Sequence, residues 1–253
     1  MTRAALVFAL LAAPSIVSAA TPAPVIRTYD LPGVGKRTYH FPAKFEHVDA
    51  MTASMLLRAK VVKKWLPAGM KPIAHFGLVR GRVTVQRMGA PPDDMRPYDE
   101  ATSLSVRVRD AEGKPGWHIL EMPVNSREAQ QRGDKIFGYP KRLEEVEVTG
   151  KEGIMVGSAA TPTGQPKFMA IVEPILKIPW KLRLTNHNVQ TLRDRPVVLD
   201  STARGKLRVG LGTVFFSEEM RARYPGLPGR PFTYLGATLT DAELSLSLPQ
   251  PSL

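Results

Sequence analysis

The chain has 253 residues, 43% of them hydrophobic, and its 35 lysines and arginines against 23 aspartates and glutamates give a formal net charge of +12. This apolar content supports a packed core and excludes an intrinsically disordered chain. The absence of cysteine excludes disulfides, thiol nucleophiles and thiolate metal sites, while the 23 prolines, above the usual share of about 5%, disfavour long uninterrupted helices.

The first 20 residues have the pattern of a secretory signal peptide. Arg3 precedes the apolar run AALVFALLAA at residues 4–13, and the small residues that follow offer a cleavage site after Ala19 or Ala20. The run is shorter than the ~20 residues that a bilayer-spanning helix needs, so we expect no stable membrane anchor. We therefore expect an exported protein, periplasmic or secreted after cleavage.

The next elements are a tether and a helix. Residues 21–36 mix proline, glycine and charged residues without a period and predict an N-terminal tether, followed by a domain over residues 37–253. A helix is predicted to begin at Thr52 and to end at Pro67. Its apolar positions have spacings of four, three and four residues: Met55, Ala59, Val62 and Leu66.

Beyond this helix the hydrophobic pattern has a period of two, which is typical of strands. In residues 100–109, Leu104, Val106 and Val108 alternate with polar side chains. Similar runs occupy residues 78–85, 117–124, 143–148, 154–159, 168–172, 206–216 and 237–248. Turn residues separate them, and helices do not follow strands regularly. The pattern predicts a mainly β (α+β) fold, an antiparallel β-barrel or sandwich with a few helices.

Several common functional motifs are missing. The five histidines lack the spacing of zinc sites, so no metal site is predicted. A G-x-S-x-G nucleophile elbow and complete dinucleotide or P-loop motifs are also absent. The positive charges are scattered and aromatic residues make up only 7% of the chain, so we expect no nucleic-acid partner.

One pair of motifs points to a specific chemistry. Residues 138–142 read Gly-Tyr-Pro-Lys-Arg, and about forty residues upstream the chain has Tyr98-Asp99-Glu100. Here the chain resembles the acetoacetate decarboxylase family, in which a Gly-(Phe/Tyr)-Pro-Lys-Lys segment presents a lysine and an upstream Tyr-x-Glu supplies a glutamate to the active site. The resemblance implies a barrel in which Lys141 forms a Schiff base with a small keto acid and Glu100 positions the substrate or moves a proton.

The resemblance also suggests how the lysine is activated. A free lysine is almost entirely protonated at neutral pH, so Schiff-base chemistry requires a lowered pKa. An apolar surrounding and a neighbouring cation both lower it, an activation for which acetoacetate decarboxylase is the known example. Arg142 stands where the family has a second lysine, and its charge would lower the Lys141 pKa and attract the substrate carboxylate. The implied substrate-binding residues are Tyr139, Met122 and Tyr98.

The family pattern implies no metal or organic cofactor and a symmetric homo-oligomer. Strand parity independently places Glu100 on the side of Leu104 and Val106, if the strand is regular, with Asp99 pointing away. A carboxylate that faces a core needs a partner or a function.

Two family features differ here. The family has an arginine before its first long helix, whereas no arginine lies between Arg37 and Arg58 and Lys44 is the nearest substitute. A further pocket glutamate of the family would align near Gln86. Three functions follow as hypotheses: decarboxylation of a small β-keto acid, aldol or dehydratase chemistry on pyruvate-like keto acids, and binding of a small molecule by a non-catalytic periplasmic barrel.

Overall fold

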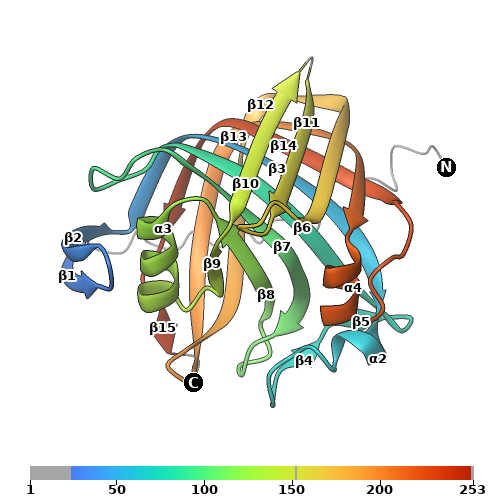
Figure 1. Ribbon diagram of the computed structural model, residues 1–253, viewed down its shortest axis with the longest axis horizontal. Coiled ribbons are helices and arrows are strands. Elements are labelled where there is room, and N and C mark those ends of the chain that lie inside the picture. Colours follow the sequence, from blue (N-terminus) through green and yellow to red (C-terminus); the bar gives the residue numbers. More distant parts are fainter. Residues whose placement is uncertain (1–23, 152, 252–253) are drawn as a thin grey trace.

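The computed structural model describes residues 24–151 and 153–251, and most of them lie in β-strands (Figure 1). The predicted signal peptide lies outside these residues, so export stays a prediction. Strands β1 and β2 form a separate hairpin, whereas the remaining strands belong to one large sheet. The mainly β fold predicted from the hydrophobic pattern is therefore confirmed.

The elements have these bounds. The strands are β1 Val25–Leu31, β2 Gly35–Phe41, β3 Ala43–Arg58, β4 Lys71–Pro72, β5 Ala74–His75, β6 Leu78–Ala90, β7 Tyr98–Arg109, β8 Pro115–Val124, β9 Lys141–Leu143, β10 Glu145–Lys151, β11 Ile154–Ala160, β12 Pro166–Leu192, β13 Arg195–Phe216, β14 Phe232–Leu246 and β15 Gln250–Pro251. The helices are α2 Ala59–Val62, α3 Arg127–Arg132, the π-helical η1 Gly133–Phe137 and α4 Glu218–Arg223. None of the helices in the described chain has the length and apolar character needed to cross a membrane.

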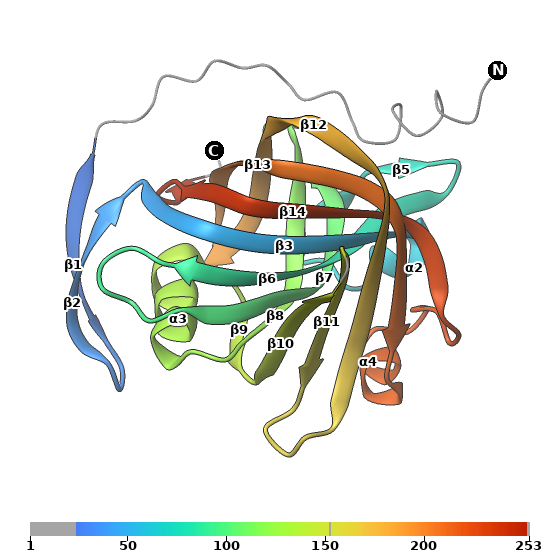
Figure 2. The same ribbon diagram turned by 90° about the horizontal axis from the view of Figure 1, so that it is seen from above.

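The large sheet curls back on itself (Figures 1 and 2). Its strand order is β10-β11-β12-β13-β14-β3-β6-β7-β8-β9, and these neighbours are antiparallel except for β8 and β9. Strand β12 is long because its first part pairs with β11, while Asn188 near its end is the partner of Trp117 on β8. This second pairing closes a ring of strands.

The strands in the middle of the sheet have both faces covered. On β6, Val79, Val83 and Val85 belong to a first core, to which β10, β11 and the start of β12 also contribute. The alternate residues of β6 point to the opposite face, where a second core includes residues of β1, β2, α3 and η1. Polar side chains on that second face therefore lie inside the molecule.

The helix predicted from Thr52 to Pro67 is wrong over most of its length. Strand β3 runs through Arg58, and helix α2 covers only Ala59–Val62. Strand β3 pairs with β14 on one side and with β6 on the other. Its buried residues alternate with a period of two: Met51, Ala53, Met55 and Leu57. These long-range pairings decide the conformation here, because the short apolar run fits both periods.

The predicted tether over residues 21–36 also differs from the structure where residues are described. The hairpin of β1 and β2 begins at Val25, and its strands pair from Val25 and Phe41 to Leu31 and Gly35. Leu31 and Phe41 are buried in the second core. The hairpin therefore packs as part of the domain.

A histidine links the closing strands of the ring. His187 on β12 lies 2.7 Å, measured from Nδ1, from Oδ1 of Asp200 on β13, and its Nε2 lies 3.0 Å from Oδ2 of Asp110, which precedes β8. The Asp200 hydrogen bond raises the pKa of His187 above its usual value, and that of Asp110 acts in the same direction.

We expect this histidine to make stability depend on pH. Because its folded-state pKa is raised, its contribution is fully present below the unfolded pKa of about 6.5 and is lost as pH rises through the folded value. The free energy of unfolding should fall by about 1 kcal/mol over that rise, the scale of one protein hydrogen bond. Denaturant titrations of the wild type and His187→Gln between neutral and alkaline pH test this; equal pH dependence in both proteins contradicts it.

Candidate active site

The segment before Lys141 turns sharply and aims the lysine inward. Gly138 ends η1 with a φ of 67°, and a Cβ at this position would lie 2.7 Å from the carbonyl oxygen of Thr191. Only glycine fits both conditions. The Met122 amide then donates a hydrogen bond to the Pro140 carbonyl, and Lys141 begins β9 opposite Met122 on β8. Two backbone constraints thus fix the position from which Lys141 projects.

The amine of Lys141 meets the carboxylate of Glu100. Nζ lies 2.5 Å from Oε2, and the two side chains are only 7% and 4% exposed. The Gln86 amide donates a hydrogen bond to the other carboxylate oxygen, Oε1. Gly133 makes room for the lysine, because a Cβ there would overlap the Cδ of Lys141. The two residues singled out in the sequence therefore form one buried pair.

Glu100 is buried, but not for the reason that strand parity gave. One extra residue of β7 is accommodated between the pairs Arg82–Ser105 and Thr84–Thr102, which is a β-bulge. The bulge moves Glu100 to the face opposite Leu104 and Val106. Glu100 therefore points to the face that carries Gln86 and Lys141, not into the first core.

Two tyrosines lie beside the pair. The ring centroid of Tyr98 is 5.7 Å from Nζ of Lys141, and both Tyr98 and Tyr139 are buried. Burial raises the pKa of each phenol, and the negative charge of Glu100 raises it further. Arg82 and a hydrogen bond with Asn188 act against these effects at Tyr139 without reversing them. Both residues therefore remain neutral phenols that are able to donate hydrogen bonds.

The remaining predicted residues divide between this site and the surface. Met122 is buried beside Lys141. Arg142 is exposed, and it follows Lys141 directly on β9, so its side chain leaves the opposite face of the strand. On that face the positive charge of Arg142 opposes the rise that burial causes in the pKa of Tyr224. Lys44 is also exposed. The structure therefore does not bring Arg142 to Lys141, and the lysine-activating role predicted for Arg142 has no support in this geometry.

A second buried lysine lies across β8. The Lys167 amine donates to Glu121 and, at 2.9 Å, to both carboxylate oxygens of Glu144. Arg223 also binds Glu121, at 2.8 Å. Burial raises the pKa of Glu121, but the hydrogen bonds and charges of Lys167 and Arg223 outweigh it and hold that pKa below its usual value. No sequence motif marked this network, whose carboxylates are already matched by cations.

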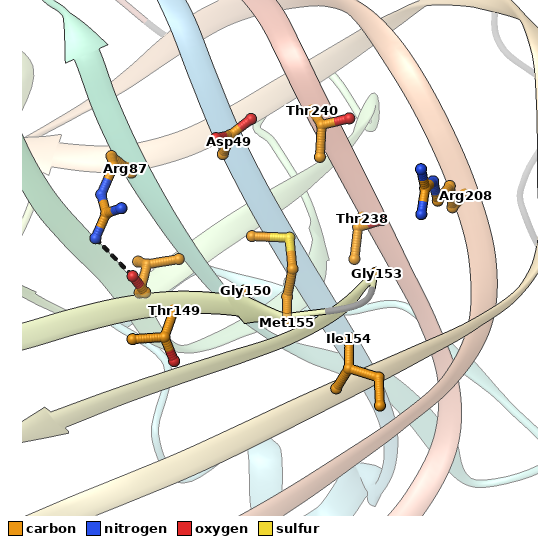
Figure 3. Close-up of a pocket in the computed structure, with 11 residues that line it drawn as sticks. Asp49, Arg87, Thr149, Gly150, Gly153, Ile154, Met155, Arg208, Thr238 and Thr240 are labelled. Carbon is orange, nitrogen blue, oxygen red and sulfur yellow. Dashed lines mark hydrogen bonds between the residues drawn. The ribbon is translucent and has the colours of Figure 1, made fainter.

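A surface cleft is separate from the lysine site (Figure 3). It has a volume of about 350 Å³, and the Lys141–Glu100 pair does not line it. Arg87 forms one wall of the cleft. It donates a hydrogen bond of 2.6 Å to the Val148 carbonyl oxygen, and two of its nitrogens donate hydrogen bonds to the carboxylate of Asp99. Asp49, Thr240 and Arg208 lie on the other strands around it.

Comparisons with known proteins identify a family and a shared fold. The acetoacetate decarboxylase family model matches residues 29–174. A solved acetoacetate decarboxylase is similar in structure, with a TM-score of 0.65, 14% identity and coverage of 83% of this chain and 88% of that chain. The acetoacetate decarboxylase of Legionella pneumophila has a TM-score of 0.58, 13% identity and coverage of 84% and 87%.

Another structural relative is the enduracididine biosynthesis enzyme MppR, solved with pyruvate. Its TM-score is 0.57, its identity 16%, and the match covers 84% of this chain and 91% of that chain. At identities this low, the structural similarity shows a shared fold. Comparison with curated proteins gives no match.

Proposed function

The chain belongs to the acetoacetate decarboxylase family, and we propose that it is an enzyme that condenses the amine of Lys141 with a small keto acid and decarboxylates a β-keto acid. The observation that carries this proposal is the buried contact of 2.5 Å between Lys141 and Glu100. No metal or organic cofactor enters the proposed chemistry.

The Lys141–Glu100 pair supplies a route to the neutral amine that Schiff-base formation requires. An ammonium has no lone pair with which to attack a carbonyl, so Lys141 must first lose a proton. Glu100 lies within hydrogen-bond distance and accepts that proton, which leaves a neutral amine beside a neutral acid. In this proposal Glu100 replaces Arg142 as the residue that activates the lysine.

The reaction then needs only water and one proton from solvent. Nζ adds to the keto carbon, and loss of water gives an iminium. The bond to the β-carboxylate breaks, its electron pair moves to the iminium nitrogen, and carbon dioxide leaves an enamine. Glu100, whose first proton left with that water, takes another from solvent and gives it to the enamine carbon. Water then adds to the resulting iminium and releases the ketone and Lys141. Tyr98 and Tyr139 stay neutral through this cycle and are placed to orient the substrate by hydrogen bonds.

Condensation chemistry is the second candidate. The structural relative MppR was solved with pyruvate and also with the condensation product of pyruvate and imidazole 4-carboxaldehyde. In this alternative Lys141 would form the same iminium with pyruvate, and the derived enamine would attack an aldehyde. The two candidates share the lysine and differ in the products, carbon dioxide in one and a new carbon–carbon bond in the other.

Reductive trapping tests the proposal. After incubation with acetoacetate and borohydride, we expect the peptide that contains Lys141 to carry the mass of a reduced acetone adduct, since trapping follows loss of carbon dioxide. A reduced acetoacetate adduct without release of carbon dioxide would exclude decarboxylation, and a pyruvate adduct with aldehyde-dependent products would favour condensation. An unmodified Lys141 with every keto acid would contradict both and leave a non-catalytic binding protein.

We also propose that the chain forms a homo-oligomer. An exposed apolar strip on β12 and β13 supports this: Ile175, Leu176, Trp180 and Leu211 are 75%, 49%, 62% and 46% exposed. Trp180→Glu should therefore shift the protein to a smaller species in sedimentation or light scattering. Phe76→Glu is the control, because Phe76 is exposed in a turn away from this strip. A wild-type monomer contradicts the proposal.

A further inference from the structure

Three arginines surround the ring of Trp117 on the inner face of the sheet. The guanidinium carbons of Arg82, Arg107 and Arg80 lie 4.0, 5.3 and 5.5 Å from the ring centroid. Arg80 and Arg82 alternate on β6, Arg107 lies on β7, and Trp117 is the partner of Arg107 on β8. Trp117 is 5% exposed. We call Arg80, Arg82 and Arg107 the arginine cluster.

The arginine cluster concentrates positive charge, and two of its members, Arg82 and Arg107, have no carboxylate partner among the described residues. Burial lowers the pKa of Arg82, and the positive charges of Arg80 and Arg107 lower it further. Burial and the charge of Arg80 also lower the pKa of Arg107. Arg82 donates hydrogen bonds to neutral partners, Oγ of Ser105 at 3.3 Å and Oδ1 of Asn186 at 3.2 Å. In the described part of the chain, no aspartate or glutamate forms an ion pair with Arg82 or Arg107. A bound anion would relieve this repulsion.

The arginine cluster faces the same interior as the reactive pair. Arg82 and Gln86 point to one face of β6, and their Cα atoms are four residues apart, about 13 Å along an extended strand. The phenol of Tyr139 is close enough to both Glu100 and Arg82 for their charges to act on its pKa, Glu100 raising it and Arg82 lowering it. Asn188, which hydrogen-bonds Tyr139, and Asn186, which accepts from Arg82, are alternate residues of β12. The segment that carries Tyr139 and Lys141 is therefore linked to the arginine cluster through two alternate residues of β12.

We propose that the arginine cluster binds a second, distal carboxylate of the keto acid whose carbonyl reacts with Lys141, so that the substrate is a keto dicarboxylic acid. This inference rests on the proposed function. Guanidinium groups bind carboxylates through paired hydrogen bonds, and stacking on Trp117 holds their planes in place.

The carboxylate bound there is not the one that leaves. The leaving carboxylate is attached one carbon from the carbonyl and must remain near Lys141, whereas the cluster lies farther along the strand. Tight binding of the leaving group would also stabilise the ground state and slow its loss. Binding energy from a distant carboxylate instead holds the carbonyl at Nζ.

Two measurements test the cluster. The first compares kcat/KM for 3-oxoadipate, a β-keto dicarboxylic acid, with that for acetoacetate. We expect the wild type to favour 3-oxoadipate, Arg107→Gln to reduce this preference by about 10- to 100-fold, the scale of one or two charge-assisted hydrogen bonds, and Arg107→Lys to restore it only in part. Arg204→Gln is the control, because Arg204 is exposed on β13. An unchanged preference in Arg107→Gln overturns the inference.

The second measurement separates this inference from the proposed function. Glutarate has two carboxylates but no ketone, so its calorimetric binding does not require Schiff-base formation. We expect glutarate to bind both the wild type and Lys141→Met and to lose at least ~10-fold in affinity in Arg82→Gln, whose fold circular dichroism checks. If trapping at Lys141 fails but this pattern holds, only the proposed function fails. Binding of inorganic phosphate in place of glutarate, or equal glutarate binding in Arg82→Gln, overturns the carboxylate site.

Discussion

Replacing Lys141 by methionine should lower turnover of the keto acid by about 10³-fold or more and abolish reductive trapping, because among the described residues Lys141 supplies the amine that contacts Glu100. Methionine preserves much of the length of the stem that packs against Gly133. Steady-state kinetics with mass spectrometry of the borohydride-treated protein give both readouts. Lys141→Arg should be equally inactive, because it keeps a positive charge but has no amine that can form the iminium.

A partner variant separates chemistry from structure. Glu100→Gln keeps the size of the side chain and removes its ability to exchange a proton with Lys141, so we expect a loss of about 10²- to 10⁴-fold in kcat. Circular dichroism should show that the fold of Glu100→Gln is unchanged, so that the loss in kcat reports on the chemistry. Activity of Lys141→Met near that of the wild type, in a folded protein, would exclude the Schiff-base proposal.

The second large effect concerns stability and the other buried lysine. Lys167→Met should lower the free energy of unfolding by about 3–5 kcal/mol, the scale of breaking a buried ion pair. The Lys167 amine binds both Glu121 and Glu144. Its removal leaves two buried carboxylates without the ammonium, although Arg223 and the Tyr224 hydroxyl still bind Glu121. Denaturant unfolding followed by tryptophan fluorescence measures the change.

A compensating substitution keeps this prediction testable if Lys167→Met does not fold. Adding Glu121→Gln and Glu144→Gln removes the charges that Lys167 neutralises, so the triple variant should recover part of the lost stability. The loss of stability in Lys167→Met should also grow as pH rises above the usual carboxyl pKa, because Lys167 no longer helps to lower the pKa of the buried Glu121. A loss below about 1 kcal/mol in the single variant would show that the network contributes little.

The contrast between the two lysines shows what a sequence motif contributes. Lys141 stands in a five-residue segment whose glycine is required by the backbone, since Gly138 has a positive φ and closely approaches Thr191. Lys167 lies in a strand without any distinguishing pattern, yet it is the more deeply buried of the two, at 1% exposed. Burial therefore does not single out the lysine that we propose to be catalytic, whereas the local backbone does.

Other residues of the site escaped prediction for a different reason. Arg80 and Arg82 alternate with valines in a run that predicts a strand with one solvent-exposed face. Because the sheet closes through β8 and β12, that second face is turned inward, toward Trp117. The same residue pattern fits a surface and an interior, and only ring closure decides between them.

The sequence by itself determined the β-rich class, the positions of most strands and the segment that presents Lys141, because these depend on alternation and on backbone requirements within a few residues. Only the tertiary structure decided that residues 52–58 are strand, that a bulge in β7 aims Glu100 at Lys141, and that Arg142 points away. Those outcomes depend on pairing between segments distant in the chain, and the register of that pairing selects which face each side chain occupies.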